Sequence, residues 1–124
     1  MSNKKSILLV EDDEFLAELY ATKLNLENFE VSLAVDGEKG LKMIKELKPD
    51  LILLDIILPK MDGFEILKNM KADPELKNIP VILLTNLSQK DEVKRGLDLG
   101  ATDYLIKAHF MPSEVVKKIK QILG

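Results

Sequence analysis

Three short apolar runs stand out along the chain, and none of them alternates with polar residues. They cover residues 7–10, 51–54 and 81–84. Apolar runs of this length without alternation are typical of strands that are buried on both faces of a parallel sheet. Two further strands are expected at residues 29–34 and 104–106. The pattern therefore predicts a buried parallel sheet.

Between these runs, apolar residues recur with a helical period. The stripes are Phe15, Leu16, Leu19, Tyr20 and Leu24; Leu41, Ile44 and Leu47; Phe64, Leu67 and Met70; and Val115, Val116, Ile119, Ile122 and Leu123. Spacing of three or four residues is that of an amphipathic helix with one buried face. Residues 89–99 carry the weakest such pattern, with few apolar positions and Gly96 inside, so we expect the least stable helix there.

Turn-forming residues separate the periodic segments. They are Asp36-Gly37, Pro49, Pro59, Asp62-Gly63, Pro80 and Gly100. Asp62 is a favourable N-cap for a helix that starts near Gly63. Five strands alternating with five helices predict an α/β sandwich with helices on both faces of the sheet. Right-handed crossovers favour the flavodoxin-like (βα)5 strand order, 2-1-3-4-5.

Composition supports a single folded domain over residues 1–124. Apolar residues make up 46% and charged residues 31%, which is typical of a globular domain rather than a disordered or membrane-embedded chain. The net charge of −3 argues against direct nucleic-acid binding. The apolar run at residues 7–10 is too short for a signal peptide or a membrane span. Since the chain also has no cysteine, we expect a cytoplasmic protein.

Polar residues follow four of the five predicted strands. They are Glu11, Asp12 and Asp13 after the first strand, Asp55 at the end of the third, Thr85 at the end of the fourth and Lys107 after the fifth. Ligands of an open parallel sheet bind outside the carboxyl ends of its strands. A buried, unpaired carboxylate is costly. We therefore expect Asp55 at the rim of the core, within a polar cluster.

These residue types suit one kind of chemistry. Clustered carboxylates repel one another unless a cation lies among them. Mg²⁺ fits because it prefers oxygen ligands, whereas a chain with no cysteine and one histidine does not fit zinc. A metal ion and a lysine neutralise an arriving anion, and a threonine hydroxyl can donate to one of its oxygens. These are the requirements of phosphoryl transfer to an aspartate.

Four segments carry a resemblance to a known family: ILLVEDD, LILLDIILPKMDGFEIL, VILLTN and GATDYLIK. Together they resemble the CheY-like receiver domain of bacterial two-component response regulators, over essentially the whole chain. The resemblance implies that Asp55 is the phosphoacceptor. It also implies that Glu11, Asp12 and Asp55 hold Mg²⁺, with the backbone carbonyl of Ile57 as a further ligand.

The resemblance also implies a conformational switch. Thr85 matches the switch hydroxyl, Lys107 the lysine that pairs with the phosphoryl group, and Tyr104 the aromatic residue that changes rotamer. The donor would be a histidine kinase or a histidine phosphotransfer protein, and the fourth helix, fifth strand and fifth helix would contact an unknown downstream protein. Such a domain assists only its own phosphorylation and dephosphorylation and is not otherwise an enzyme. We expect no membrane contact and no DNA-binding or enzymatic output domain in this chain.

Simpler interpretations exist for several of these residues. Acidic residues after a strand favour the start of a helix, and we assign Asp13 and Glu14 to that role. Taken alone, Thr85 and Lys107 are compatible with an ordinary strand-end hydroxyl and a solvated lysine. His109, the only histidine, is expected in a surface loop.

The sequence departs from the family pattern at a few positions. Ala108 follows Lys107 at a position where the family usually has proline, and the peptide bond before that proline is often cis. A cis bond before alanine would cost about 3 kcal/mol, so we expect either a trans bond with a shifted loop or a strained exception. Asn86 stands where a small residue is usual. The apolar Ile57 and Leu87 flank the path of the attacking water, and we hypothesise that they make the phosphorylated state long-lived.

Other classes of protein remain as alternatives. A pseudo-receiver would keep the fold as an interaction module without being phosphorylated. A flavodoxin-like nucleotide or flavin binder would need a Gly/Ser/Thr-rich phosphate loop after the first strand, where this chain has EDDE. A haloacid-dehalogenase-type phosphatase has its acceptor after the first strand, whereas Asp55 ends the third. The sequence is compatible with a stand-alone regulator and with a receiver excised from a longer protein.

Overall fold

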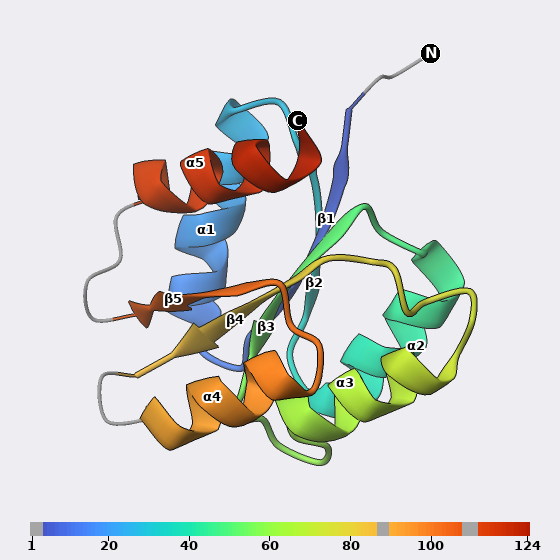
Figure 1. The fold of residues 1–124 in the computed structure, drawn as a ribbon. Helices are drawn as coiled ribbons and strands as arrows, with labels where there is room; N and C mark the ends of the chain where they lie inside the picture. Colours follow the sequence, from blue (N-terminus) through green and yellow to red (C-terminus); the bar gives the residue numbers. More distant parts are fainter. Residues whose placement is uncertain (1–3, 87–89, 108–111) are drawn as a thin grey trace.

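The computed structural model describes residues 4–86, 90–107 and 112–124, in which strands and helices alternate (Figure 1). In chain order these are β1 (Ser6–Val10), α1 (Glu14–Leu26), β2 (Glu30–Ala34), α2 (Gly37–Leu47), β3 (Leu51–Asp55), α3 (Gly63–Ala72), β4 (Val81–Thr85), α4 (Lys90–Asp98), β5 (Asp103–Ile106) and α5 (Pro112–Leu123). The structure therefore confirms five strands alternating with five helices among the described residues.

The strands form one parallel sheet in the order β2-β1-β3-β4-β5, so the predicted flavodoxin-like topology is confirmed. Figure 1 shows α1 and α5 together on one face of the sheet and α2, α3 and α4 on the other. The strand order reverses direction at β1, and a crevice between loops at such a point is where ligands of this architecture bind.

Two hydrophobic cores explain why the strand sequences do not alternate. In β1, Leu8 and Val10 face the core under α2 and α3, whereas Ile7 and Leu9 face the core under α1 and α5. All residues of β3 and β4 are buried because these strands lie inside the sheet with helices on both sides. A strand buried on both faces needs apolar residues at every position.

Aspartate side chains begin three of the helices. Asp13, Asp36 and Asp62 are the N-caps of α1, α2 and α3, and each accepts a hydrogen bond from a backbone N–H three residues later. The expected cap at Asp62 and the expected helix start at Asp13 are thus confirmed. Gly100, with φ at +108°, follows α4 in a conformation that favours glycine, as expected for a helix stop.

Several predicted boundaries and two predicted stripes differ from the structure: besides Phe15, the stripe residues Leu19 and Leu47 are 42% and 51% exposed. β2 begins at Glu30, one residue later than expected, although Phe29 is still buried; β5 begins at Asp103, one residue earlier. The interpretation of Phe15 as part of a buried stripe is wrong, since its side chain is 79% exposed. In α1, Ala17 together with Tyr20 takes the inward positions, and the helical period then directs Phe15 to solvent.

Helix α4 is the most weakly buried of the expected helices. Among its described residues only Gly96 is buried, whereas the guanidinium of Arg95 lies 4.3 Å from the centroid of the Phe64 ring in α3. This fits the sparse apolar pattern of its sequence. Predictions that concern Leu87, the Lys107-Ala108 bond and His109 lie outside the described residues.

Within the part of the chain that the structure describes, no helix has the length and apolar character needed to cross a membrane.

Candidate functional site

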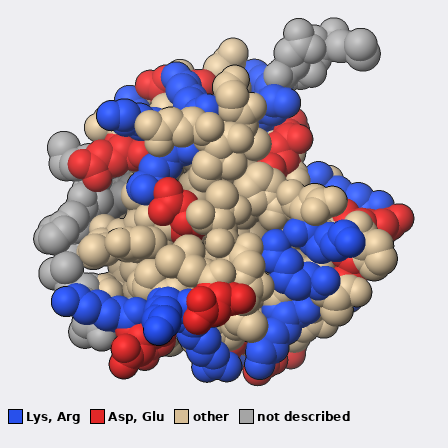
Figure 2. All heavy atoms as spheres, in the orientation of Figure 1, with Lys and Arg blue, Asp and Glu red and all other residues tan. Residues whose placement is uncertain are grey.

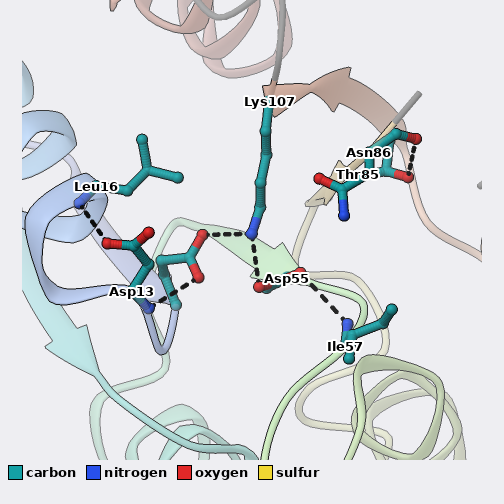
Figure 3. Close-up of polar contacts among 8 residues, drawn as sticks. Asp13, Leu16, Asp55, Ile57, Thr85, Asn86 and Lys107 are labelled. Atoms are coloured by element: carbon teal, nitrogen blue, oxygen red, sulfur yellow. Dashed lines mark hydrogen bonds and ion pairs between the residues drawn. The ribbon is translucent and has the colours of Figure 1, made fainter. Parts of the chain in front are cut away.

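The polar residues predicted at the strand ends meet at the carboxyl edge of the sheet (Figure 3). The register of the parallel strands brings this about, because it sets Asp55 beside Leu84 and Thr85 beside Ile106. Glu11 then follows β1, and Lys107 follows β5, at the same edge. Residues from four strands, far apart in sequence, thus share one surface.

Three carboxylates lie together at this edge. Glu11, Asp12 and Asp55 each place a carboxylate oxygen within 4.8 Å of the others. Glu11 and Asp55 are buried, with 1% and 5% of their surface exposed, whereas Asp12 is exposed. A hard divalent cation such as Mg²⁺ prefers carboxylate oxygens and keeps several waters, and one open side suits this. The donor set therefore fits Mg²⁺.

The ammonium of Lys107 bridges the two buried acids. Its Nζ lies 2.7 Å from Oδ2 of Asp55 and 2.6 Å from Oε1 of Glu11, and the lysine side chain is only 18% exposed. Figure 3 shows the lysine reaching from the end of β5 into the space between them. One positive charge thus faces two buried negative charges, so the buried part of the cluster carries an uncompensated negative charge.

Backbone N–H groups complete the support of the buried acids. The N–H of Asp13 donates to Oε2 of Glu11 at 3.2 Å, and the N–H of Ile57 donates to Oδ1 of Asp55 at 3.3 Å. Both carboxylates are therefore held from two sides, by a backbone donor and by Lys107. Sequence reasoning did not identify these two N–H donors, because residue type says nothing about a backbone group.

Electrostatics at the site reflects crowding of like charges. Burial, opposed by the hydrogen bond from Lys107 and reinforced by Asp55, raises the pKa of Glu11 above its ordinary value. Partial burial and the neighbouring Glu11 also raise the pKa of Asp12. Burial alone would lower the pKa of Lys107, but its hydrogen bonds to Asp55 and Glu11 outweigh this, so that its pKa is raised. Glu11 and Asp12 thus hold protons more readily than usual, because burial and a neighbouring carboxylate both disfavour their charged forms.

Tyr20 is a neighbour of the site that the sequence pattern assigned only to the core. Its side chain is buried, and burial together with the charges of Glu11 and Asp55 raises its pKa. The tyrosine is therefore a buried core residue close enough to these acids for their charge to disfavour its ionisation. A helical stripe predicts that such a residue faces inward, but it does not predict which end of the core it reaches.

The predicted switch residues lie on the β4 and β5 side of the cluster. Thr85 is 1% exposed, and its hydroxyl donates to the backbone carbonyl of Asn86 at 3.2 Å. Tyr104 on β5 is 38% exposed. Between them lies a pocket of about 260 Å³ that both residues line together with Val93 and Ile106. Ile57 lies in the loop after β3 and is 61% exposed.

Comparison with known proteins gives a family for this arrangement. The family model described as the response regulator receiver domain matches residues 7–120. The chain belongs to the response regulator receiver family. Members of this family are signalling phosphoacceptors, so the resemblance stated from the sequence motifs is confirmed.

Curated relatives are longer than this chain. The chain is 38% identical over 117 residues to the DNA-binding dual master transcriptional regulator RpaA of Synechocystis, covering 94% of the chain and 48% of the relative. It is 37% identical over 117 residues to the DNA-binding response regulator MtrA of Mycobacterium tuberculosis, covering 94% of the chain and 50% of the relative. The chain thus spans about half the length of these relatives.

Solved receiver structures superpose closely on the fold. A putative response regulator from Chloroflexus aurantiacus matches with a TM-score of 0.92 and 34% identity, covering 98% of each chain. The chemotaxis response regulator CheY4 of Vibrio cholerae matches with a TM-score of 0.90 and 27% identity, over 98% of this chain and 100% of that one. The receiver domain of a sensor histidine kinase from Pseudomonas aeruginosa, solved with magnesium in its active site cleft, matches with a TM-score of 0.89 and 27% identity over 98% of each chain.

Proposed function

We propose that the chain is a phosphoacceptor signalling domain in which Asp55 receives a phosphoryl group in a Mg²⁺-dependent reaction. The observation that carries this proposal is the convergence of Glu11, Asp12 and Asp55 around the ammonium of Lys107 at the carboxyl edge of the sheet. Structural supports alone would not require three acids within reach of one another, since like charges at that distance repel.

The chemistry follows from how the residues hold Asp55. Glu11, Asp12 and Asp55 would hold the metal ion, with the carbonyl of Ile57 as a further ligand, and bound Mg²⁺ would neutralise charge on the phosphoryl oxygens. A carboxylate oxygen of Asp55 attacks phosphorus, the bond from phosphorus to the donor atom breaks, and the electron pair of that bond leaves with the donor. The Ile57 N–H and Lys107 hold the Asp55 carboxylate beforehand, and Lys107 would contact the transferred phosphoryl oxygens.

The switch residues give this reaction a structural consequence. We infer that Thr85 turns from its present acceptor toward the phosphoryl oxygens and that Tyr104 rotates inward. The pocket of about 260 Å³ beside both side chains supports this, because it offers room for part of the tyrosine ring. Weakly buried α4 forms another wall of this pocket through Val93, so the face made of α4, β5 and α5 would change for a downstream protein.

The donor would be a phosphorylated histidine kinase or histidine phosphotransfer protein. Two exposed apolar side chains follow the acids closely in sequence: Phe15 in the first turn of α1 and Ile57 after β3, 79% and 61% exposed. Such residues are suited to a protein donor whose phosphohistidine has to reach Asp55. Ile57 would also hinder water after transfer; a phosphorylated state that survives only seconds at neutral pH would contradict this hypothesis.

Intact-mass spectrometry after incubation with acetyl phosphate tests the proposal directly. The parent protein should gain one phosphoryl group only when Mg²⁺ is present, and Asp55→Asn should gain none. Asp62→Asn is a matched control, because it removes a nearby carboxylate while asparagine remains a good N-cap for α3. No gain in the parent under any condition would instead favour a pseudo-receiver.

Further variants separate phosphorylation from the switch. Thr85→Ala and Lys107→Ala should still accept the phosphoryl group, at a reduced rate for the lysine variant, but should not transmit it to α4. Backbone amide NMR shifts of α4 and β5, recorded before and after phosphorylation, report this transmission. Shifts equal to those of the parent protein in either variant would show that the assigned role is wrong.

A further inference from the structure

The opposite, amino edge of the sheet carries a pair of adjoining hollows between α1 and α5. The first has a volume of about 570 Å³, with Phe29 and Leu123 among its apolar walls and Lys4, Lys5 and Lys120 around it. In Figure 1 the end of α5 lies close to the start of β1, which brings these segments together. The hollow therefore joins an apolar floor to a cationic rim.

The second hollow, of about 480 Å³, continues along the groove between the two helices. Lys23 of α1 and Lys117 of α5 line it, with Val116 as an apolar wall. Glu27 and Lys120 line both hollows and form the ridge between them. The two hollows together thus form one bipartite surface, which we call the amino-edge groove.

The amino-edge groove is strongly cationic although the whole chain carries a net charge of −3. Among the described residues its lining includes five lysines, Lys4, Lys5, Lys23, Lys117 and Lys120, and one acidic side chain, that of Glu27. Lys23 and Lys120 lie 3.2 and 3.4 Å from the carboxylate of Glu27, and these two lysines lower its pKa. Figure 2 shows lysine or arginine atoms over α5 and beside the start of β1 at the top of the molecule.

The lysines of α5 divide between two faces. Lys118 turns toward β5 and lies 2.8 Å from Asp103, whereas Lys117 and Lys120 line the groove. The apolar stripe of α5 accounts for its packing on the sheet, but the stripe does not require lysines on the groove side. Their gathering with Lys4 and Lys5 from the other end of the chain therefore calls for an account of its own.

We propose that the amino-edge groove docks an acidic peptide segment of a partner protein, with apolar side chains of the peptide in the hollows and its carboxylates on the lysine rim. Charge complementarity selects an anionic occupant, and the apolar walls select one with hydrophobic side chains. A nucleic acid fits less well, because a phosphate backbone favours a continuous cationic track and a basic protein. This docking goes beyond the proposed phosphoryl transfer, which takes place at the other edge of the sheet.

Fluorescence anisotropy with a labelled peptide of alternating Glu and Leu or Phe residues tests the proposal. The peptide should bind the parent protein, and two matched peptides should bind at least about tenfold more weakly: one with Gln for Glu and one with Ala for the apolar residues. Binding should also weaken as salt rises toward about 0.15 M, where charges are screened over about 8 Å.

Charge-matched variants assign the binding to the groove. The triple variant Lys4→Gln, Lys5→Gln, Lys120→Gln should lower the affinity about tenfold or more, since three exposed ion pairs are lost. The control triple Lys42→Gln, Lys45→Gln, Lys68→Gln removes three exposed lysines of α2 and α3 and should change it less than about twofold. Amide shifts caused by the peptide should centre on residues 27–29 and on α5.

Three results would overturn the proposal. Equal losses in the two triple variants would show general charge attraction rather than a site. Equal binding of the Ala-substituted peptide would show that the hollows take no side chains. Tighter binding of a single-stranded oligonucleotide than of the peptide would assign the groove to nucleic acid. Labelling by acetyl phosphate in the same samples remains a separate readout, so that failure of docking is distinguishable from failure of the phosphoacceptor assignment.

Discussion

At the scale of single residues, the site is defined by a shortage of positive charge. Lys107 is the one cation within hydrogen-bond reach of the buried acids Glu11 and Asp55 among the described residues. Removing one member of a buried ion pair destabilises a protein by more than the intact pair stabilises it, because the remaining charge stays buried without a partner. Here two acids would remain, so we expect the lysine to stabilise the metal-free fold in addition to its proposed role in phosphoryl transfer.

Lys107→Met should therefore destabilise the protein in Mg²⁺-free buffer. Methionine keeps the apolar stem but leaves Glu11 and Asp55 facing each other. We expect a loss of about 2 kcal/mol, below the 3–5 kcal/mol of a fully buried pair because the lysine is partly exposed. Urea unfolding measures it, and added Mg²⁺ should recover part of the loss.

Lys118→Met is the control for this substitution. The control breaks the ion pair between Lys118 and Asp103, in which both side chains are about one-third exposed. The loss in the free energy of unfolding should be less than about 1 kcal/mol. Equal losses for the two variants would show that Lys107 acts as an ordinary surface charge.

The raised pKa of Glu11 gives a second prediction at this scale. Between its ordinary value of 4.5 and its higher folded value, the folded protein binds more protons than the unfolded chain. Stability in Mg²⁺-free buffer should therefore fall as pH rises through this window, and the loss should persist above it. Glu11→Gln keeps an oxygen that can accept from Lys107 but removes the charge, so its stability relative to the parent protein should increase over the same window.

Urea unfolding from about pH 4.5 to pH 7 measures this difference. Other groups titrate in both proteins, and the comparison between them cancels those contributions. Glu18→Gln changes an exposed glutamate of α1, and its free energy of unfolding should differ from that of the parent protein by the same amount at every pH. If the stability of Glu11→Gln also ran parallel to that of the parent protein at every pH, the charged form of Glu11 would not destabilise the fold.

The sequence could predict which residues lie at the site, but it could not predict all the contacts that these residues make. Acids, a threonine and a lysine at strand ends are visible in a sequence, because strand ends follow from apolar runs. The backbone donors of Asp13 and Ile57 are invisible there, and so is the reach of Tyr20 toward the acids. Phe15 shows the opposite error, since an apolar residue with helical spacing was assigned to a buried stripe although it faces solvent.

At the scale of elements, α4 is attached to the sheet through a glycine. A Cβ at Gly96 would lie 2.2 Å from Cδ1 of Leu83, a fully buried side chain of β4. The weak apolar pattern of residues 89–99 predicted a loosely held helix, but it did not show that close approach of the backbone takes the place of side-chain packing. A helix held in this way can shift without exposing a large area of apolar side chains to water.

Gly96→Ala tests this attachment. Alanine favours the helix by up to about 1 kcal/mol, whereas forcing a methyl group into a packed core costs about 1–3 kcal/mol. We expect a net loss of about 1 kcal/mol by urea unfolding. In Leu83→Ala, where space has been made, the same substitution should cost less or even stabilise the protein; additive losses would show that Leu83 and Gly96 are not coupled.

Helix α1 carries a prediction about the donor. Phe15→Ala should slow phosphoryl transfer from a phosphorylated histidine kinase about tenfold, because an exposed aromatic residue in the first turn of α1, three residues after Asp12, is a natural contact for the donor. Transfer from acetyl phosphate should not change, since this small donor needs no docking surface. Leu26→Ala removes a 78% exposed apolar residue at the far end of the same helix and should leave both rates unchanged.

Both α1 substitutions lie on the surface, so each should change stability by less than about 0.5 kcal/mol. A loss of transfer from acetyl phosphate in Phe15→Ala would indicate damage to the site rather than to docking. Equal effects of the two substitutions on the kinase reaction would place the contact elsewhere on α1.

At the scale of the whole molecule, the sequence predicted the architecture well. Apolar runs marked the interior strands, and the handedness of crossovers left a few strand orders, of which the favoured flavodoxin-like order is the one observed. The starts of β2 and β5 shifted by one residue because propensity does not locate the first hydrogen bond of a strand. The amino-edge groove was out of reach of pattern reasoning, since it joins residues from both ends of the chain. The fold thus carries negative charge at the carboxyl edge of its sheet and positive charge in the groove at its amino edge.

The acidic edge should make the stability of the whole fold depend on Mg²⁺. A ligand that binds only the folded state stabilises it in proportion to the logarithm of its concentration, by about 1.4 kcal/mol at ten times its dissociation constant, or a few degrees in Tm. Asp12→Asn should abolish this shift while leaving metal-free stability nearly unchanged, because Asp12 is exposed. Asp62→Asn removes one negative charge in the same way but lies outside the acid cluster, and it should keep the full shift. Differential scanning calorimetry with and without Mg²⁺ compares the three proteins. An equal shift in all of them would mean that Mg²⁺ only screens an acidic surface, and the assignment of Asp12 as a ligand would then be wrong.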